Sequence, residues 1–105
     1  VILAVEAFEG TDETLTRAGR LGGAGVVVVK IARPDHDLRY DIPVVGLNTL
    51  ATLKKIKAAV LAVEARRTIL LEKELLIAAA DQQDLTLIAV ETQTINSKFQ
   101  IPNTK

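Results

Sequence analysis

The residues best suited to chemistry lie in one polar stretch, residues 30–43, which reads KIARPDHDLRYDIP. It combines three cations, three carboxylates and the only histidine of the chain: Lys30, Arg33, Arg39, Asp35, Asp37, Asp41 and His36. Cations on a short loop suit a phosphate or pyrophosphate group, because charge-assisted hydrogen bonds hold that group in place. Carboxylates in the same loop would repel the phosphate unless they bind Mg²⁺ or take a proton from an attacking water. Metal-assisted phosphoryl hydrolysis requires such a mixture.

The same stretch also fits a solvated surface loop whose opposite charges neutralise one another in salt bridges. Pro34 and Pro43 bracket it and exclude a regular helix or a central strand at those positions. His36 alone is a weak indication, since a single surface histidine is most often neither a base nor a metal ligand. The spacing therefore leaves both the phosphate site and the solvated loop open.

A second candidate is the run Glu9, Gly10, Thr11 and Asp12, which precedes a helical pattern over residues 11–21. Thr11 or Asp12 is a suitable N-cap, and acids near a helix N-terminus are favoured by the helix dipole. This structural role needs no ligand. The same N-terminus could also receive an anion through its free backbone N–H groups, so both interpretations stay open.

A third candidate is the run of residues 64–68, EARRT. Its arginines and Thr68 could clamp a phosphate, or they could cover a turn. The pentapeptide LAVEA occurs twice, at residues 3–7 and 61–65. The repeat is either a coincidence in a chain rich in Val, Ala and Leu or two strand ends that present Glu6 and Glu64 at one edge of a sheet.

The composition excludes several classes of function. The formal net charge is zero and aromatic residues make up only 3% of the chain, so neither a global field nor stacking faces favour nucleic acid. We therefore expect no nucleic-acid partner. The absence of cysteine excludes a thiolate nucleophile and a cysteine-based zinc site. The sequence also lacks the P-loop, GxGxxG, GxSxG and HExxH motifs.

Several features bear on where the protein works. No apolar run is long enough to cross a bilayer, and no signal-peptide pattern is present. The absence of cysteine fits a cytoplasmic protein. The chain has no methionine and opens on apolar residues, so we expect it to be a fragment of a longer protein.

Hydrophobic periodicity predicts alternating strands and helices. The expected strands are residues 1–7, 26–31, 44–45, 60–65 with an extension at 68–71, and 85–90. The expected helices are residues 11–21, 48–57 and 72–83. The near-continuous apolar run at 26–31 is typical of a strand covered on both faces. Residues 91–105 are polar and aperiodic, and we expect a loosely packed or disordered tail.

This order predicts an α/β fold: one layered domain over residues 1–90 with a mainly parallel or mixed sheet flanked by about three helices. Ligands of such sheets bind at the carboxyl ends of the strands. The three polar candidates each follow a predicted strand, so we expect them at that edge.

Read together, the segments resemble the C-terminal domain of the LpxI-type UDP-2,3-diacylglucosamine pyrophosphatase family. Residues 5–12 resemble its VEAxEGTD element, and Arg17-Ala18-Gly19 continues it. The residues from Lys30 to Thr49 resemble its K-x-x-K-P-x-Q-D-x-R-x-D-x-P-x-x-G-x-x-T element. Glu64-Ala65, Thr68 and Ala80-Asp81 resemble its A-x-E-A-G-x-T element and closing helix. The match is collinear from residue 1 to about residue 90.

The resemblance implies hydrolysis of UDP-2,3-diacylglucosamine to UMP and 2,3-diacylglucosamine 1-phosphate (lipid X) in lipid A biosynthesis. Water would be the nucleophile and a divalent cation, Mg²⁺, would assist. Asp41 would be the essential carboxylate and Asp37 the second, both also metal ligands, and Lys30 and Arg39 would contact phosphate. The remaining residues expected to line the substrate site are Glu9, Gly10, Thr11, Asp12, Glu64 and Thr68.

The resemblance also implies partners and a location. Family members have an N-terminal domain that closes over the substrate, so the isolated chain is expected to be inactive without it. A homodimer is an alternative partner arrangement. The expected location is the cytoplasm, at the cytoplasmic face of the inner membrane, with membrane contact no more than peripheral.

This sequence departs from the family pattern at several positions. Arg33 replaces Lys, His36 replaces Gln, and Lys57 and Arg66 replace glycines. A glycine position can require a positive φ, which puts the turn at Arg66 in doubt. Two alternatives to the enzyme stand beside it: an α/β module that binds a nucleotide sugar or phosphate without chemistry, and a structural domain whose polar loop is solvated surface.

Overall fold

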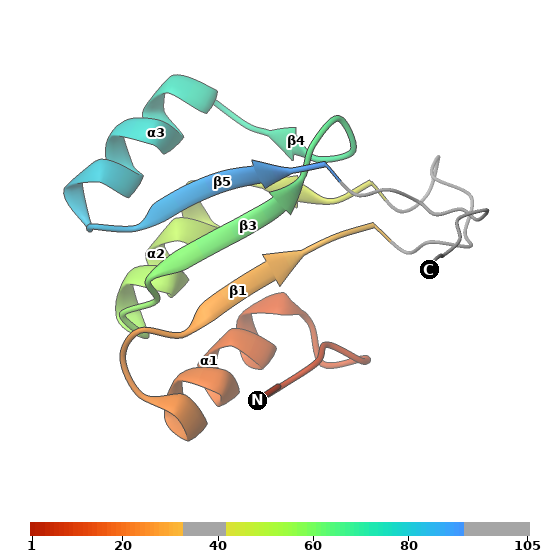
Figure 1. Ribbon diagram of the computed structural model, residues 1–105, viewed down its shortest axis with the longest axis vertical. Helices are drawn as coiled ribbons and strands as arrows, with labels where there is room; N and C mark the ends of the chain where they lie inside the picture. Colours follow the sequence, from red (N-terminus) through yellow and green to blue (C-terminus); the bar gives the residue numbers. More distant parts are fainter. Residues whose placement is uncertain (33–41, 92–105) are drawn as a thin grey trace, which may run out of the picture.

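The computed structural model describes residues 1–32 and 42–91 (Figure 1). Its elements, in chain order, are α1 (Thr11–Gly22), β1 (Val27–Lys30), β2 (Val44–Val45), α2 (Leu47–Lys55), β3 (Val60–Glu64), β4 (Ile69–Leu70), α3 (Lys73–Gln82) and β5 (Thr86–Val90). The chain is an α/β domain, as the alternation of strand and helix patterns predicts.

The described strands form two parallel sheets rather than one. The larger sheet has the order β1-β3-β5, and β2 pairs with β4 in a two-stranded sheet. Every one of these pairs is parallel, so each connection crosses from one end of a sheet to the other. All carboxyl ends of the larger sheet therefore lie along one edge, which is toward the right in Figure 1.

The core lies between the larger sheet and the helices. Five side chains are fully buried there: Leu50, Leu53, Leu61, Leu76 and Val45. Burying each of them contributes roughly 1.5–3 kcal/mol to the free energy of folding. Leu50 and Leu53 form a buried apolar stripe on α2, whereas Leu47 at the start of the helix is 40% exposed.

The opposite face of the larger sheet is open, which corrects the prediction that both faces of the run 26–31 are covered. Val27 and Val29 are 62% and 64% exposed. Both belong to β1, the edge strand, and paired residues of neighbouring strands point to the same side of a sheet. Among the described residues no element packs over that side of β1, so the apolar run indicates a strand but not its two-sided burial.

The N-terminal segment is not a strand, so the prediction for residues 1–7 is wrong. Residues 1–6 have no ladder partner in the described structure, and Val1, Ile2 and Val5 are largely exposed. Leu3 alone packs against the core, where Gly22 of α1 admits it: a Cβ on Gly22 would lie 2.3 Å from Leu3 Cδ1.

The second LAVEA copy does form a strand, because β1 and β5 hydrogen-bond to it on both sides. Identical pentapeptides thus take two conformations, and neighbouring strands rather than local propensity decide between them.

Helix and turn boundaries follow the predictions closely, with two informative differences. Gly10, at φ 95°, is the N-cap of α1, and neither Thr11 nor Asp12 caps it. Gly46 is the N-cap of α2, which begins at Leu47, one residue before the predicted start. Lys57 and Arg66 have φ of 57° and 66°, which confirms that these two family glycine positions require the left-handed region.

Candidate functional site

The carboxyl ends of β1 and β3 are joined by a buried carboxylate. Glu64, the last residue of β3, is 7% exposed, and its Oε1 accepts a hydrogen bond of 3.1 Å from the backbone N–H of Ala32. Ala32 is 6% exposed and immediately precedes the charged residues of the polar loop. Glu64 therefore fixes Ala32, the residue at which the chain leaves β1. The hydrogen bond from Ala32 also gives the buried carboxylate a polar partner.

The far end of the polar loop is also anchored. The backbone N–H of Ile69 donates to the carbonyl oxygen of Pro43 at 2.9 Å, where the two-stranded sheet begins. Both ends of the loop are thus attached to the chain around β3 and β4. Asp37, Arg39 and Asp41, with His36, lie outside the described residues, and their predicted roles stay predictions.

The turn after β3 is held by internal contacts. Thr68 Oγ1 donates to the carbonyl oxygen of Glu64 at 2.9 Å, and Arg67 Nε lies 3.9 Å from Glu64 Oε2. Arg66 forms an exposed ion pair with Glu91 after the end of β5. In this structure Thr68 and Arg66 stabilise the turn, which favours the turn-covering interpretation of this run.

The run at the start of α1 is likewise internally bonded. Thr11 Oγ1 donates to Glu6 Oε1 at 2.9 Å, and Arg17 Nη2 lies 2.6 Å from Glu9 Oε2. The hydrogen bond from Arg17 holds the pKa of the Glu9 carboxyl below its ordinary value of 4.5. Glu9 is therefore ionised and paired at neutral pH.

Asp12 connects α1 to α2. Its Oδ1 accepts a hydrogen bond of 3.1 Å from Thr52 Oγ1, which lies forty residues further along the chain. Gly10 meets no atom within 4 Å of the place where a Cβ would stand, so its φ of 95°, rather than crowding, requires glycine.

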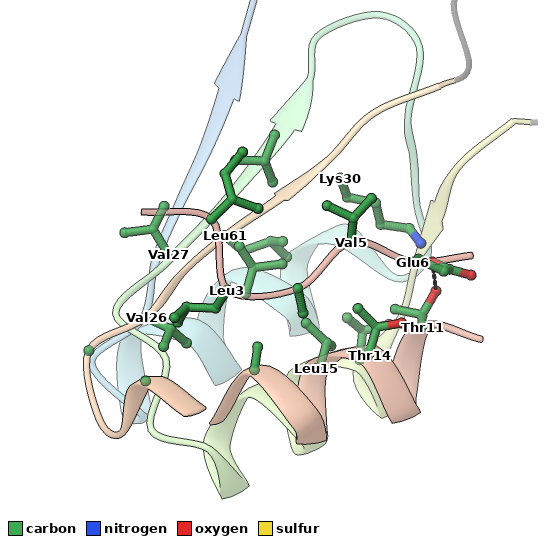
Figure 2. Close-up of a pocket in the computed structure, with 18 of the residues that line it drawn as sticks. Leu3, Val5, Glu6, Thr11, Thr14, Leu15, Val26, Val27, Lys30 and Leu61 are labelled. Carbon is green, nitrogen blue, oxygen red and sulfur yellow. Dashed lines mark hydrogen bonds between the residues drawn. The ribbon is translucent and has the colours of Figure 1, made fainter. Parts of the chain in front are cut away.

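Lys30 lies at the carboxyl end of β1 and shares a groove with Glu6 and Thr11 (Figure 2). The groove has a volume of about 800 Å³ and is bounded by residues 1–6, α1 and β1. The structure gives no ion pair between Lys30 and a carboxylate of the described residues. Lys30 thus presents a cation at one end of the groove, as a phosphate contact requires.

The structure brings part of the predicted site together. Glu6, Thr11 and Lys30 line one groove, while Glu64 holds the residue two positions after Lys30. Glu9 pairs on the surface with Arg17, and Asp12 bonds to α2 instead. The sequence did not predict the apolar walls of the groove. The aliphatic residues 1–5, which were assigned to a strand, form one of these walls.

The described residues contain no cluster of potential metal ligands. Within residues 1–32 and 42–91, no three His, Asp or Glu side chains gather closely enough to hold a metal ion. The carboxylates of Glu6, Glu9, Asp12 and Glu64 each have a protein partner. The predicted Mg²⁺ ligands, Asp37 and Asp41, lie outside the described residues.

A parallel sheet with a charged loop after its edge strand belongs to the class of α/β domains that bind ligands at the carboxyl ends of strands. Residues 1–88 match the LpxI C-terminal domain family, and the chain belongs to that family. The UDP-2,3-diacylglucosamine pyrophosphatase LpxI of Caulobacter vibrioides is 34% identical over 101 residues. That match covers 89% of this chain and 36% of the relative, so the chain spans about a third of the relative's length.

No helix among the described residues is long and apolar enough to span a membrane.

Proposed function

We propose that the chain is the C-terminal domain of a hydrolase that cleaves the pyrophosphate of UDP-2,3-diacylglucosamine to UMP and lipid X in lipid A biosynthesis. The observation that carries the proposal is family membership over residues 1–88, which span the polar loop and its anchored ends. The Caulobacter relative is named as a UDP-2,3-diacylglucosamine pyrophosphatase, which supports the proposal.

The proposed chemistry assigns roles to four charged residues of the polar loop. Lys30 and Arg39 bind the pyrophosphate, and their charges offset the negative charge that builds up during attack. Asp41 accepts the proton of the attacking water, with Asp37 beside it as the second carboxylate. The water oxygen bonds to one phosphorus, and the bridging P–O bond breaks so that its oxygen leaves with the other phosphate. Mg²⁺, when bound by Asp37 and Asp41, would polarise the phosphoryl oxygens.

Residues at the end of β3 and at the start of α1 are proposed to support this chemistry indirectly. Glu64 fixes Ala32, which sets where Lys30 and the following loop leave the sheet. Glu9, Gly10, Thr11 and Asp12 shape the start of α1 beside the groove. We propose that these residues border the substrate and act through geometry, since their side chains already have partners.

The proposed active unit includes more than this chain. The matched relative is nearly three times as long as the matched segment, and the resemblance implies an N-terminal domain that closes over the substrate. We propose that this domain completes the site, and that the assembled enzyme meets its lipid-linked substrate peripherally at the cytoplasmic face of the inner membrane.

Release of UMP from UDP-2,3-diacylglucosamine in the presence of Mg²⁺ tests the proposal. The chain is assayed alone and then with the N-terminal domain of the Caulobacter relative added. Activity that appears only after the addition supports a divided active site with Asp41 on this chain. Absence of activity in both assays, with UMP release by the intact relative as the positive control, contradicts it.

A binding module without chemistry is the second candidate. The observation that favours it is that Glu6, Glu9 and Asp12 are each bonded to a neighbouring side chain, which leaves them poorly placed as bases. Calorimetric binding of UDP-2,3-diacylglucosamine without any UMP release, even with the N-terminal domain present, would select this candidate.

A further inference from the structure

We propose that the groove between residues 1–6, α1 and β1 binds one acyl chain of the substrate, with the phosphate-bearing end at Lys30. This inference rests on the proposed function, because it takes the lipid-linked nucleotide sugar as the ligand. It adds a subsite that the polar residues alone do not reveal.

The first argument is the lining of the groove. Most of its wall is aliphatic, and its deepest residues are Leu15, Val26 and Leu61, which are 5%, 9% and 0% exposed. A volume of about 800 Å³ falls within the roughly 300–1,000 Å³ typical of ligand pockets. An apolar hollow of this size gains free energy by exchanging water for hydrocarbon.

The second argument is that the polar residues gather at one end. Figure 2 shows Lys30, Glu6 and Thr11 at the same side of the view, with Leu3, Val26 and Val27 toward the other. The hydroxyl of Thr11 donates a hydrogen bond to Glu6, and Thr14 Oγ1 donates to the carbonyl oxygen of Gly10 at 2.9 Å. Lys30 is the cation at this end and has no ion pair among the described residues, while the Glu6 carboxylate beside it accepts the hydrogen bond from Thr11.

This polarity identifies the occupant. An aliphatic channel with a cation at one end matches an anionic head joined to a hydrocarbon chain, because each part then meets its own environment. Lys30 also precedes the polar loop that is proposed to bind the pyrophosphate. An acyl chain that enters at Lys30 would be continuous with the sugar and phosphates held there.

The third argument is the N-terminal wall. Residues 1–6 pair with none of the described strands, and Leu3 attaches this wall to the core through its side chain. Val5 is 69% exposed and lines the groove. A wall of this kind can adjust to a hydrocarbon chain without breaking sheet hydrogen bonds.

The test is calorimetric titration of the whole chain with UDP-2,3-diacylglucosamines of short, medium and long acyl chains, and with UDP-N-acetylglucosamine. We expect the affinity to rise about two- to fourfold with each methylene until the groove is filled. Ala18→Phe, which fills the groove from α1, should lower the long-chain affinity at least about tenfold. Ala78→Phe, on the exposed surface of α3, is the matched control and should leave it unchanged.

A second variant covers the case in which Ala18→Phe does not fold. Val5→Asp places a charge in the exposed wall and should also weaken long-chain binding, while Ile77→Asp on α3 serves as its control. Affinity for the acylated nucleotides that does not depend on chain length overturns the groove but leaves the proposed function standing.

Dodecyl phosphate separates the two proposals further, because it carries the anion and the hydrocarbon without the nucleotide. Binding of dodecyl phosphate that is lost in Val5→Asp, with no binding of any UDP-sugar even when the N-terminal domain of the Caulobacter relative is added, supports the groove and contradicts the proposed function. No binding of dodecyl phosphate or of the acylated nucleotides, with that domain present, overturns the groove and the function together.

Discussion

Replacement of Glu64 by alanine should destabilise the domain and loosen the start of the polar loop. Glu64 and Ala32 are 7% and 6% exposed, and the hydrogen bond between them is 3.1 Å long. The alanine variant leaves the buried N–H of Ala32 without this acceptor, which costs about 1–3 kcal/mol. Glu64→Gln keeps a carbonyl oxygen in place but loses the charge, so we expect a smaller loss of about 0.5–1.5 kcal/mol.

Urea denaturation measures the difference. With a slope of about 1–3 kcal/mol per molar urea for a domain of this size, a loss near 2 kcal/mol lowers the midpoint by about 1 M. Glu91→Ala is the control, because it removes a carboxylate from an exposed ion pair with Arg66 and should cost no more than about 1 kcal/mol. UMP release by the assembled enzyme should fall more in Glu64→Ala than in Glu64→Gln.

A free energy of unfolding of Glu64→Ala within about 0.5 kcal/mol of that of the parent chain would refute the role of Glu64, because ordinary surface positions behave in this way. An equal loss of unfolding free energy in Glu64→Gln and Glu64→Ala would also refute it. In that case the acceptor oxygen would not be the contribution that Glu64 makes.

Three further predictions concern other parts of the chain. In the enzyme assembled with the N-terminal domain, Asp41→Ala should lower kcat by roughly 10² to 10⁴ while urea unfolding is unchanged, and near-normal turnover would remove Asp41 from the mechanism. Arg66→Gly should raise the unfolding free energy by about 0.5–1 kcal/mol, because it relieves a left-handed backbone at some cost in chain entropy; a lower urea midpoint would contradict this. The lowered pKa of Glu9 means that its pair with Arg17 stabilises the fold above the ordinary carboxyl pKa and that this contribution is lost as the pH falls through the lowered value. Arg17→Ala should raise the Glu9 pKa toward 4.5 in a carbon-detected NMR titration, and an unmoved pKa would exclude the pair as its cause.

The sequence predicts the helices and strands of this fold well where the apolar residues of a periodic pattern are also buried in the structure. Leu50 and Leu53 lie three apart, and both are buried as the stripe requires. The run VLAVE becomes β3 because strands flank it on both sides. The run at residues 1–7 has equal strand propensity, yet strand formation needs a hydrogen-bonding neighbour, and propensity carries no information about neighbours.

The candidate site was predictable in its residue types but not in its contacts. That the turn at Arg66 can require a positive φ was anticipated, since glycine stands there in the family pattern. The bond from Ala32 to Glu64 was not, because it depends on the register that sets β1 beside β3. A pattern read along the chain cannot supply a register between strands that are thirty residues apart.

The described acids form hydrogen bonds and ion pairs within the domain, which bears on which residues could act as the proposed general base. Glu6, Glu9 and Asp12 each accept a hydrogen bond from another side chain. Glu64 accepts one from the backbone N–H of Ala32. A general base needs an oxygen aimed at the attacking water. These four acids thus support α1 and the end of β1, which agrees with the proposal that Asp37 and Asp41 supply the base. Lys30 is the described cation proposed to contact the pyrophosphate. In the assembled enzyme, Lys30→Ala should therefore raise KM before it lowers kcat, and an unchanged KM for UMP release would contradict that contact.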